Sequence, residues 1–418
     1  MARIKRFLGT FGTVGFGILI AIIVLEIMGR VLHLAPVALP DSYQNVREVV
    51  GRFPEPYSYF WFNREDGERI WVQFNYRSLR DIDHDYEKDD TTTRIMFLGD
   101  SYTAGWQVPL NDTYTGRLRD WLSDSDNVDF INAGLHGWGT DREYLYYRTE
   151  GYRYNSDVVV LQVYVGNDMI DNGIGVIEQR ELPDGRHIAT QSLTEERPYF
   201  TLGDDGELDF TAPRWLPSTR AERIGGIRSF LRQYVFTYAL LEQLMQLRSE
   251  NSDTDNEYAV RFDELFPADY YAFAPQSKTD DDWQSAWEIT TQLIQQLRVE
   301  VEANGSTLMV LLVDARWQHD LNAFATLRQT WDIPQDWQPS RWGNRFRDFL
   351  DTEDIPYIAP IDALLAYRDA TGNAIVLQKD GHWTAQGQCV VAVELHNWLI
   401  ERDVIDDTVA QRDSLIEC

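Results

Sequence analysis

A serine and a histidine in this sequence occupy positions from which they could carry out acyl-transfer chemistry together. Ser101 lies in a glycine-containing turn directly after the apolar run 94–98, and Asp380 and His382 lie two residues apart near the other end of the chain. A serine hydroxyl is a weak nucleophile until a base accepts its proton, and that base needs an acidic partner to fix its tautomer. We therefore predict Ser101 as the nucleophile, His382 as the base and Asp380 as the acid that orients it.

Acyl transfer also develops negative charge on the carbonyl oxygen of the substrate, which hydrogen-bond donors must stabilise. Three candidate donors follow predicted strands: the backbone N–H groups of Ser101 and Gly134 and the side-chain amide of Asn167. Asp100 and Asp168 are expected to support these turns, since Asx side chains accept hydrogen bonds from nearby backbone N–H groups. Each turn is common by itself, so the prediction depends on all of them falling at the exits of separate strands.

The elements that must position these residues alternate between strand and helix. Predicted strands cover 94–98, 128–132, 158–165, 307–313 and 355–359, and predicted helices cover 114–122, 283–303, 384–399 and a segment that opens at Thr140. This alternation predicts an α/β fold of three layers, α/β/α, with a central, mostly parallel sheet. Active sites in such sheets lie beyond the carboxyl ends of the strands, so the three turns should converge there.

Four short blocks of this sequence resemble those of the SGNH/GDSL hydrolases. They are Gly99-Asp100-Ser101-Tyr102-Thr103, Asn132-Ala133-Gly134, Gly166-Asn167-Asp168 and Asp380-Gly381-His382-Trp383, and the resemblance spans roughly residues 94–400. The last block is often Asp-x-x-His in the family and is Asp-x-His here, as in some members. The resemblance implies a flavodoxin-like sheet and ester hydrolysis without a metal or cofactor. Some relatives, polysaccharide O-acetyltransferase-like proteins among them, carry a membrane anchor ahead of this domain.

The N-terminal segment has the composition of a membrane helix. Residues 7–25 contain no charged side chain and follow a cluster of three basic residues, and a membrane-spanning helix needs about 20 apolar residues. The positive-inside rule places the N-terminus in the cytoplasm and residues 31–418 outside. A cleaved signal peptide is the alternative, but no A-x-A-like site follows. We predict a single-pass anchor that contacts the membrane through residues 7–28.

The predicted organisation has three parts. They are a membrane anchor over 1–30, a linker and lead-in segment over 31–90, and a hydrolase-like domain over 91–418 with an insertion at about 173–280. Within the insertion we expect a hairpin over 198–210 and an apolar-rich helix over 227–247 that cover the sheet. The sequence does not predict the role of this insertion or the oligomeric state.

Charge and composition exclude several classes of function. The net charge of -29 repels phosphate backbones, so we expect no nucleic-acid partner. The two cysteines, Cys389 and Cys418, have no zinc-ligand spacing, and a disulfide between them is left open. The phosphate-loop, dinucleotide-binding and zinc-protease motifs are absent, as is the G-x-S-x-G elbow of α/β-hydrolases. We therefore expect no metal and no cofactor.

Three functions fit these residues. The first is an ester hydrolase outside the cytoplasm, acting on O-acyl groups of a glycan or on lipid esters. The second is an O-acyltransferase that uses the same triad, because the chemistry differs only in whether water or a hydroxyl group attacks the acyl-enzyme. The third is a non-catalytic, membrane-anchored scaffold that retains the fold, since fold alone does not establish activity.

Overall fold

The computed structural model describes most of the chain. The described ranges are 2–31, 45–122, 127–172, 198–212, 280–314, 318–406 and 411–418, apart from short gaps within them, with short pieces between 180 and 188 and between 231 and 241. All structural statements below concern these residues.

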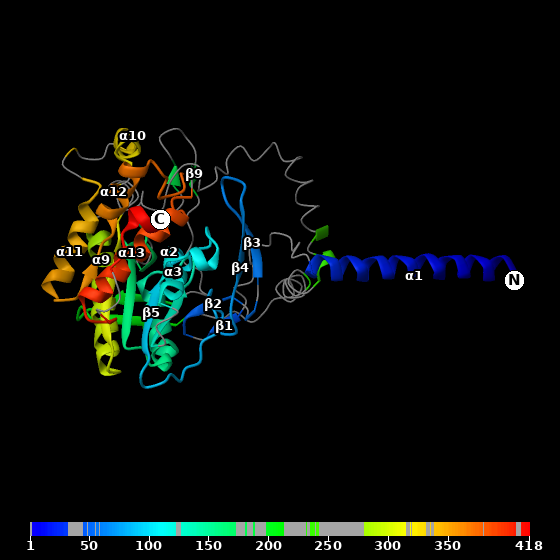
Figure 1. Ribbon diagram of the computed structural model, residues 1–418, viewed down its shortest axis with the longest axis horizontal. Helices are drawn as coiled ribbons and strands as arrows, with labels where there is room; N and C mark the ends of the chain where they lie inside the picture. Colours follow the sequence, from blue (N-terminus) through cyan, green and yellow to red (C-terminus); the bar gives the residue numbers. More distant parts are fainter. Residues whose placement is uncertain are drawn as a thin grey trace.

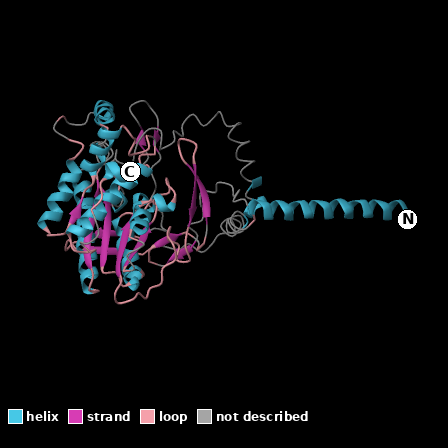
Figure 2. Ribbon diagram, viewed as in Figure 1, coloured by secondary structure: helices cyan, strands magenta, loops and turns pink. Residues whose placement is uncertain are grey.

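A five-stranded parallel sheet forms the centre of the domain (Figure 2). Its strands, in spatial order, are β13 (Tyr357–Ile358), β12 (Thr307–Val313), β7 (Val158–Tyr164), β5 (Thr93–Gly99) and β6 (Val128–Gly134). In chain order this arrangement is 2-1-3-4-5, the flavodoxin-like order that the resemblance implied. All five predicted strands are confirmed, although β13 is shorter than expected.

The strands form because their side chains are apolar and buried on both faces, as parallel sheets require. Along β5, Met96 and Leu98 contact one hydrophobic core and Ile95 and Phe97 contact the other. Helices cover both faces (Figure 1). On one side they are α3 (Tyr114–Trp121), α12 (Ile361–Thr371) and α13 (Ala385–Glu401); on the other they are α4 (Thr140–Thr149), α9 (Asp280–Ala303), α10 (Leu321–Trp331) and α11 (Arg341–Thr352). The predicted three-layer α/β/α fold is therefore confirmed.

The segment predicted as a linker, residues 31–90, is instead part of the domain over its described length. It forms two small antiparallel pairs, β1 (Asn45–Arg47) with β2 (Gly51–Phe53) and β3 (Tyr59–Asn63) with β4 (Arg69–Gln73). Phe53, Phe60 and Val72 from these strands are at most 2% exposed and share one core with β5 and α4. Because these side chains belong to that core, the packed domain begins before the predicted boundary at residue 90.

Only part of the predicted insertion is described. Its hairpin is confirmed as β10 (Tyr199–Leu202) paired with β11 (Leu208–Thr211), and a further short pair joins β8 (Arg180–Glu181) to β9 (His187–Ile188). The helix predicted over 227–247 lies almost entirely outside the described residues. Phe200 of β10 packs against Tyr144 of α4, with ring centroids 6.0 Å apart, so the hairpin covers this face of the domain.

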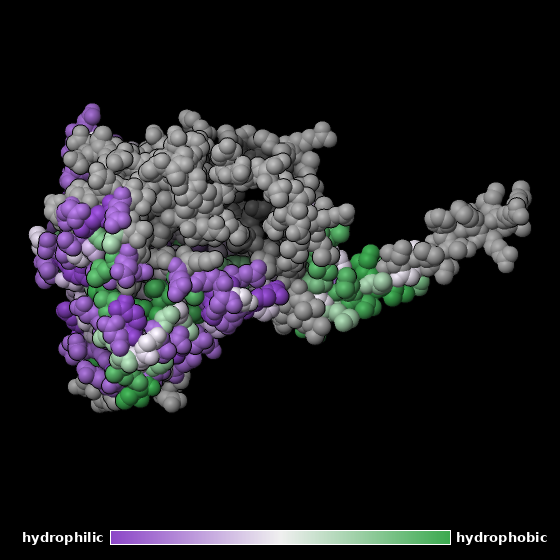
Figure 3. Space-filling view, turned by 90° about the horizontal axis from the view of Figure 1, so that it is seen from above, coloured by the Kyte–Doolittle hydropathy of each residue, from purple (hydrophilic) through white to green (hydrophobic). Residues whose placement is uncertain are grey.

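The N-terminal residues form one helix, α1 (Ala2–Val31), which projects from the domain (Figure 1). Several large apolar side chains near its C-terminal end, Leu19 and Ile27 among them, are about half exposed (Figure 3). The Glu26 carboxylate accepts the backbone N–H groups of Phe236 and Thr237 at 2.9 and 3.0 Å. Among the described residues, no helix is both long enough and apolar enough to cross a membrane.

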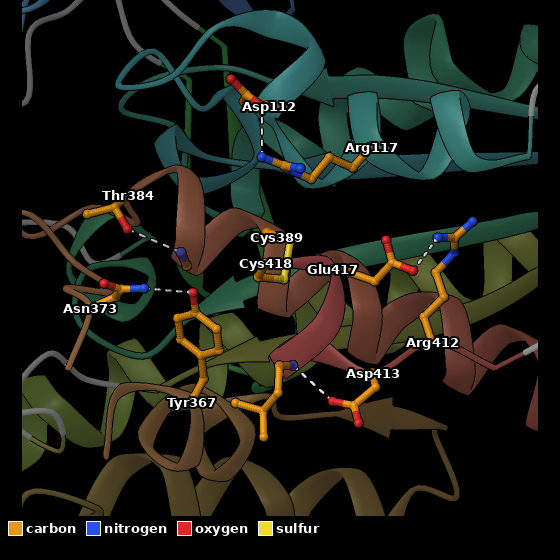
Figure 4. The surroundings of a disulfide bond; sticks show 12 residues. Asp112, Arg117, Tyr367, Asn373, Thr384, Cys389, Arg412, Asp413, Glu417 and Cys418 are labelled. Atoms are coloured by element: carbon orange, nitrogen blue, oxygen red, sulfur yellow. Dashed lines mark hydrogen bonds and ion pairs between the residues drawn. A yellow bond between two sulfur atoms is a disulfide. The ribbon is translucent and has the colours of Figure 1, made fainter. Parts of the chain in front are cut away.

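A disulfide joins Cys389 in α13 to Cys418 (Figure 4). The sequence left this pairing open. The bond fastens the short helix α14 (Ser414–Glu417) to α13, and Asn397 reinforces the attachment through hydrogen bonds with the backbone of Arg412. Cys389 is 1% exposed, so the bond lies at the edge of the core that α13 forms with the sheet.

Candidate active site

Ser101 begins a short helix directly after β5. The helix, α2 (Ser101–Ala104), is capped by Asp100, whose Oδ1 accepts the N–H of Tyr102 at 2.8 Å. Asp100 thus supports the turn as predicted. The turn is tight because Gly99 brings strand and helix together: a Cβ added there would lie 2.2 Å from Thr103 Oγ1. This geometry leaves Ser101 at the carboxyl edge of the sheet and 8% exposed.

The structure brings the three predicted triad residues into one hydrogen-bonded chain. His382 Nε2 lies 2.7 Å from Ser101 Oγ, and His382 Nδ1 lies 2.5 Å from Asp380 Oδ1. Ser101 and His382 are 281 positions apart in sequence. A carboxylate on Nδ1 keeps the proton there, so that Nε2 can accept the proton of the serine hydroxyl. This arrangement is that of a serine nucleophile with its base and orienting acid.

The loop that carries His382 is held from several sides. Gly381 in this loop has a φ of +86°, which lies in the left-handed region that favours glycine. The Tyr102 hydroxyl donates to the Gly381 carbonyl at 3.1 Å, and the Tyr102 ring lies 4.7 Å from the imidazole. Thr384 caps α13 through its side chain, as predicted, and so fixes the point where the loop ends. The ring of His382 is therefore placed by neighbouring residues before any substrate binds.

Asp380 is arranged to remain ionised. Burial alone would raise the pKa of its carboxyl, but the charge of His382 and the hydrogen bonds from its ring and backbone N–H bring that pKa down to about 2. Gln107 adds a hydrogen bond from Nε2 to Asp380 Oδ2 at 3.4 Å. Above the acidic range Asp380 is thus a carboxylate that can stabilise the imidazolium formed during catalysis.

Two of the three predicted oxyanion donors follow neighbouring strands at this edge of the sheet. Ser101 is the first residue of α2, where backbone N–H groups have no partner within the helix. Asn167 follows β7, the strand next to β5. Burial raises the pKa of the neighbouring Asp100 carboxyl, and the Asn167 side chain is one of several groups that partly oppose this rise. Its Nδ2 donates to Asp171 Oδ2 at 3.1 Å. A primary amide carries two hydrogens, so this bond uses only one of them.

Gly134 does not fit the oxyanion role that the sequence suggested. Its N–H donates to the side-chain carbonyl of Asn132 at 3.0 Å, so this donor is already used within the protein. A Cβ added at Gly134 would lie 2.5 Å from the Ala104 nitrogen. A glycine is needed here because α2 packs directly on β6, and the sequence motif reflects that packing.

Buried carboxyl groups lie beneath the site, and the sequence revealed only some of them. Asp168 is fully buried, and its Oδ2 accepts the N–H of Tyr164 at 3.0 Å. Glu143 of α4 is also fully buried, and neither of its carboxyl oxygens has a hydrogen-bond partner among the described residues. Burial, together with the charge of neighbouring acids, raises the pKa of both groups well above its ordinary value. Glu143 was missed because its place in a capping-box pattern predicts an exposed residue.

Three further histidines, His84, His136 and His319, lie in segments whose sequence is typical of turns with an exposed histidine, and the prediction of exposure has a different outcome for each. His136 is exposed, as predicted, yet it borders the site: its ring centroid lies 6.4 Å from that of His382 and stacks on Trp106 at 4.7 Å. His84 is only 6% exposed, so that prediction is wrong. It lies between Asp81 and Asp129, which make a buried imidazole favourable. His319 lies outside the described residues.

No group of three or more histidine, cysteine, aspartate or glutamate side chains is arranged to hold a metal ion in the part of the chain that the structure describes.

Comparison with known proteins gives similarity at the level of structure. No protein-family model matches the chain, and no curated protein matches it. Among similar solved structures, the acetyl xylan esterase AlAXEase has a TM-score of 0.37 at 14% identity, with 73% of this chain and 100% of that one covered. The acetylxylan esterase Axe2 from Geobacillus stearothermophilus has 0.37 at 10% identity, with 78% and 100% covered.

A GDSL-like lipase from Bacteroides thetaiotaomicron has a TM-score of 0.30 at 11% identity, with 74% of this chain and 89% of that one covered. Esterases and lipases are thus among the proteins to which this chain is similar.

Proposed function

We propose that this protein is a serine-dependent ester hydrolase of the SGNH/GDSL type. The observation that carries the proposal is the continuous hydrogen-bonded chain from Ser101 through His382 to Asp380. It lies at the carboxyl edge of the sheet, where the strand order reverses between β5 and β7 and where open α/β sheets bind their ligands.

The geometry supports the following reaction. Ser101 Oγ attacks the carbonyl carbon of the ester while His382 Nε2 accepts the hydroxyl proton. The resulting tetrahedral oxyanion is stabilised by the N–H of Ser101 and the amide of Asn167. His382 then returns the proton to the leaving alcohol oxygen, and an acyl-serine remains. Water attacks that acyl group with His382 again acting as base, and the released acid regenerates Ser101.

We propose Gly137 in place of Gly134 as the remaining backbone donor. Gly137 follows His136, whose ring borders His382, and its φ of +74° is accessible mainly to glycine. Space is open around it, since a Cβ added at this position would meet no atom within 4 Å. A backbone donor in this loop suits an incoming carbonyl oxygen better than the N–H of Gly134, which already donates to Asn132.

We further propose that the enzyme acts outside the cytoplasm on O-acyl groups of a glycan or on lipid esters, and that α1 anchors it to the membrane. Two observations support this location. The disulfide between Cys389 and Cys418 is of a kind that persists in oxidising compartments. The exposed apolar side chains near the end of α1 would be unfavourable in water and favourable in lipid.

The proposal can be tested with an active-site probe. A fluorophosphonate should label the wild-type protein at Ser101, and labelling should be lost in Ser101→Ala and strongly slowed in His382→Ala. Hydrolysis of acetyl and longer acyl esters by the same three proteins should follow the labelling. Absence of labelling in a folded wild-type protein would instead favour a scaffold without catalysis. Adding a glycan acceptor to the esterase assay tests whether a hydroxyl group competes with water for the acyl-enzyme.

A further inference from the structure

The turn that joins β3 to β4 contacts the loop of the catalytic acid. The Glu65 carboxylate accepts the backbone N–H of Gln378 through Oε1 at 2.8 Å and the backbone N–H of Asp380 through Oε2 at 2.9 Å. These hydrogen bonds span more than 310 positions of sequence. Because the acceptor is charged, each is stronger than a bond between neutral groups.

A second connection runs from the same turn to the other oxygen of Asp380. Arg64 Nη1 donates to the carbonyl of Gln107 at 3.3 Å, and Gln107 Nε2 donates to Asp380 Oδ2 at 3.4 Å. Asp380 is therefore restrained at its backbone by Glu65 and at its carboxylate by Gln107, and both restraints begin at neighbouring residues of one turn.

The turn is rigid enough to act as a support. Arg64 forms ion pairs with Asp66, at 2.6 Å, and with Glu68. The strands behind it are anchored by packing: Phe60 of β3 contacts Trp106 with ring centroids 4.9 Å apart, and Phe60 is 2% exposed. A carboxylate carried on such a hairpin has little freedom, so its two hydrogen bonds fix the backbone that they contact.

We propose that Glu65 is a positioning residue that fixes Asp380 and, through it, the ring of His382. The inference rests on the proposed function of the triad and deepens it. It assigns to the β3–β4 hairpin, which precedes the sheet in the chain, the task of completing the catalytic loop. Without Glu65 the backbone N–H groups of Gln378 and Asp380 hydrogen-bond to water instead. The loop then gains conformations in which the Asp380 carboxylate no longer contacts His382 Nδ1.

The test compares Glu65→Ala and Glu65→Gln with Asn63→Ala, all in the full chain. Asn63 is an exposed residue on the same hairpin, so its replacement is a matched control. Misplacement of a catalytic group by about 1 Å can cost on the order of 10²-fold in rate. We expect Glu65→Ala to lower kcat by about 10- to 100-fold with KM nearly unchanged. The kcat of Glu65→Gln should lie between those of the wild-type protein and Glu65→Ala, because the Gln amide can accept one of the two hydrogen bonds but not both.

The pH profile distinguishes positioning from a merely structural role. A carboxylate partner raises the pKa of an imidazole, so loosening Asp380 should shift the acidic limb of kcat/KM to lower pH in Glu65→Ala. The control should keep the wild-type limb. A lower Tm with an unshifted limb and wild-type kcat in the folded fraction would overturn the inference. Fluorophosphonate labelling of the wild-type protein separates the two proposals. If the wild-type protein is not labelled, the triad itself is overturned. If it is labelled and Glu65→Ala has wild-type kcat and pH profile, only the role of Glu65 is overturned.

Discussion

Asn167 is the residue whose proposed role differs most clearly from a structural one. Its amide donates to Asp171 and lies beside Asp100, so it links the turn after β7 to the turn that carries Ser101. A side chain in this position can stabilise the turns, donate to the oxyanion, or do both. Kinetics and stability respond differently to these roles, which makes the residue a useful probe of the site.

Replacing Asn167 by alanine should lower kcat much more than it raises KM. The donor acts mainly on the oxyanion, which exists only around the transition state, and removal of one such donor costs about 10²–10³ in kcat. Asn167→Asp should be at least as damaging, because an ionised carboxylate repels the oxyanion. Measurements of kcat, KM and Tm for both variants check this. Normal kcat with a lowered Tm would show that Asn167 only holds the turn.

At the scale of elements, the sequence predicted the regular α/β part of the fold well. Residues 308–313 are all apolar and buried, and a run of this kind is typical of a strand that is buried on both faces. The β3–β4 hairpin was not predicted because Tyr59, Trp61 and Phe62 form neither a helical nor a strictly alternating pattern. Phe60 of this hairpin packs on Trp106, and local sequence contains no information about that long-range contact.

In the candidate site, too, some residues could be predicted from the sequence and others depend on long-range packing. The position of Ser101 could be predicted because it follows a strand end, and strand ends converge in a parallel sheet. Asp380 and His382 lie just before α13 instead, and they were predicted from the chemistry of a histidine paired with an acid. The role of Gly134 could not be predicted, since a glycine needed for the close approach of α2 and a glycine that presents an N–H look identical in sequence. Glu65 gave no signal either, because a single acid in a polar turn is usually solvated. Its contact with Asp380 depends on how the hairpin packs.

The disulfide between Cys389 and Cys418 should stabilise the C-terminal helices more than the active site. The bond joins residues 29 positions apart, and closing a loop of that size stabilises the folded state by about 3–4 kcal/mol in the chain-entropy treatment. We therefore expect reduction, or Cys418→Ser, to lower Tm by several degrees with kcat nearly unchanged. Thermal unfolding with and without reductant, alongside the esterase assay, measures both. An equal Tm in the two states would contradict this expectation.

At the scale of the whole molecule, a buried charge network ties the lead-in segment to the sheet. His84 hydrogen-bonds Asp81 at 3.0 Å and pairs with Asp129 of β6 at 3.2 Å, and Asp81 also accepts the backbone N–H of Asn132 at 2.7 Å. Burial would lower the pKa of His84, but the two carboxylates, Asp129 first, raise it to about 9. His84 is therefore a buried imidazolium at neutral pH.

Global stability should fall as the pH rises from about 7 through 9. The folded state binds the His84 proton more tightly than the unfolded chain, in which an imidazole titrates near 6.5. The contribution of the protonated His84 to the free energy of unfolding is therefore complete below about pH 6.5 and is lost as the pH rises through 9. The difference in pKa corresponds to roughly 3 kcal/mol. His84→Gln should be less stable at neutral pH and show a flatter dependence over this interval. Urea unfolding of both proteins at a series of pH values provides the comparison, and parallel curves would rule out His84 as the source.

Charge and exposed apolar surface are segregated between α1 and the rest of the chain, and this segregation predicts how the protein partitions. Residues 1–30 carry a net charge of +3, which leaves -32 on residues 31–418. An acidic domain is repelled by anionic lipid, whereas the exposed apolar side chains of α1 and its basic N-terminal residues favour it. We expect the full chain to sediment with membranes and a variant lacking residues 1–30 to remain in the supernatant with its esterase activity.

Replacing Leu19 and Ile23 by aspartate in the full chain is the matched control, because it keeps α1 and its Glu26 contact but adds charge to the apolar surface. This variant should also be released from the membrane. If the truncated protein still sediments, the membrane contact lies elsewhere in the chain and α1 is not the anchor.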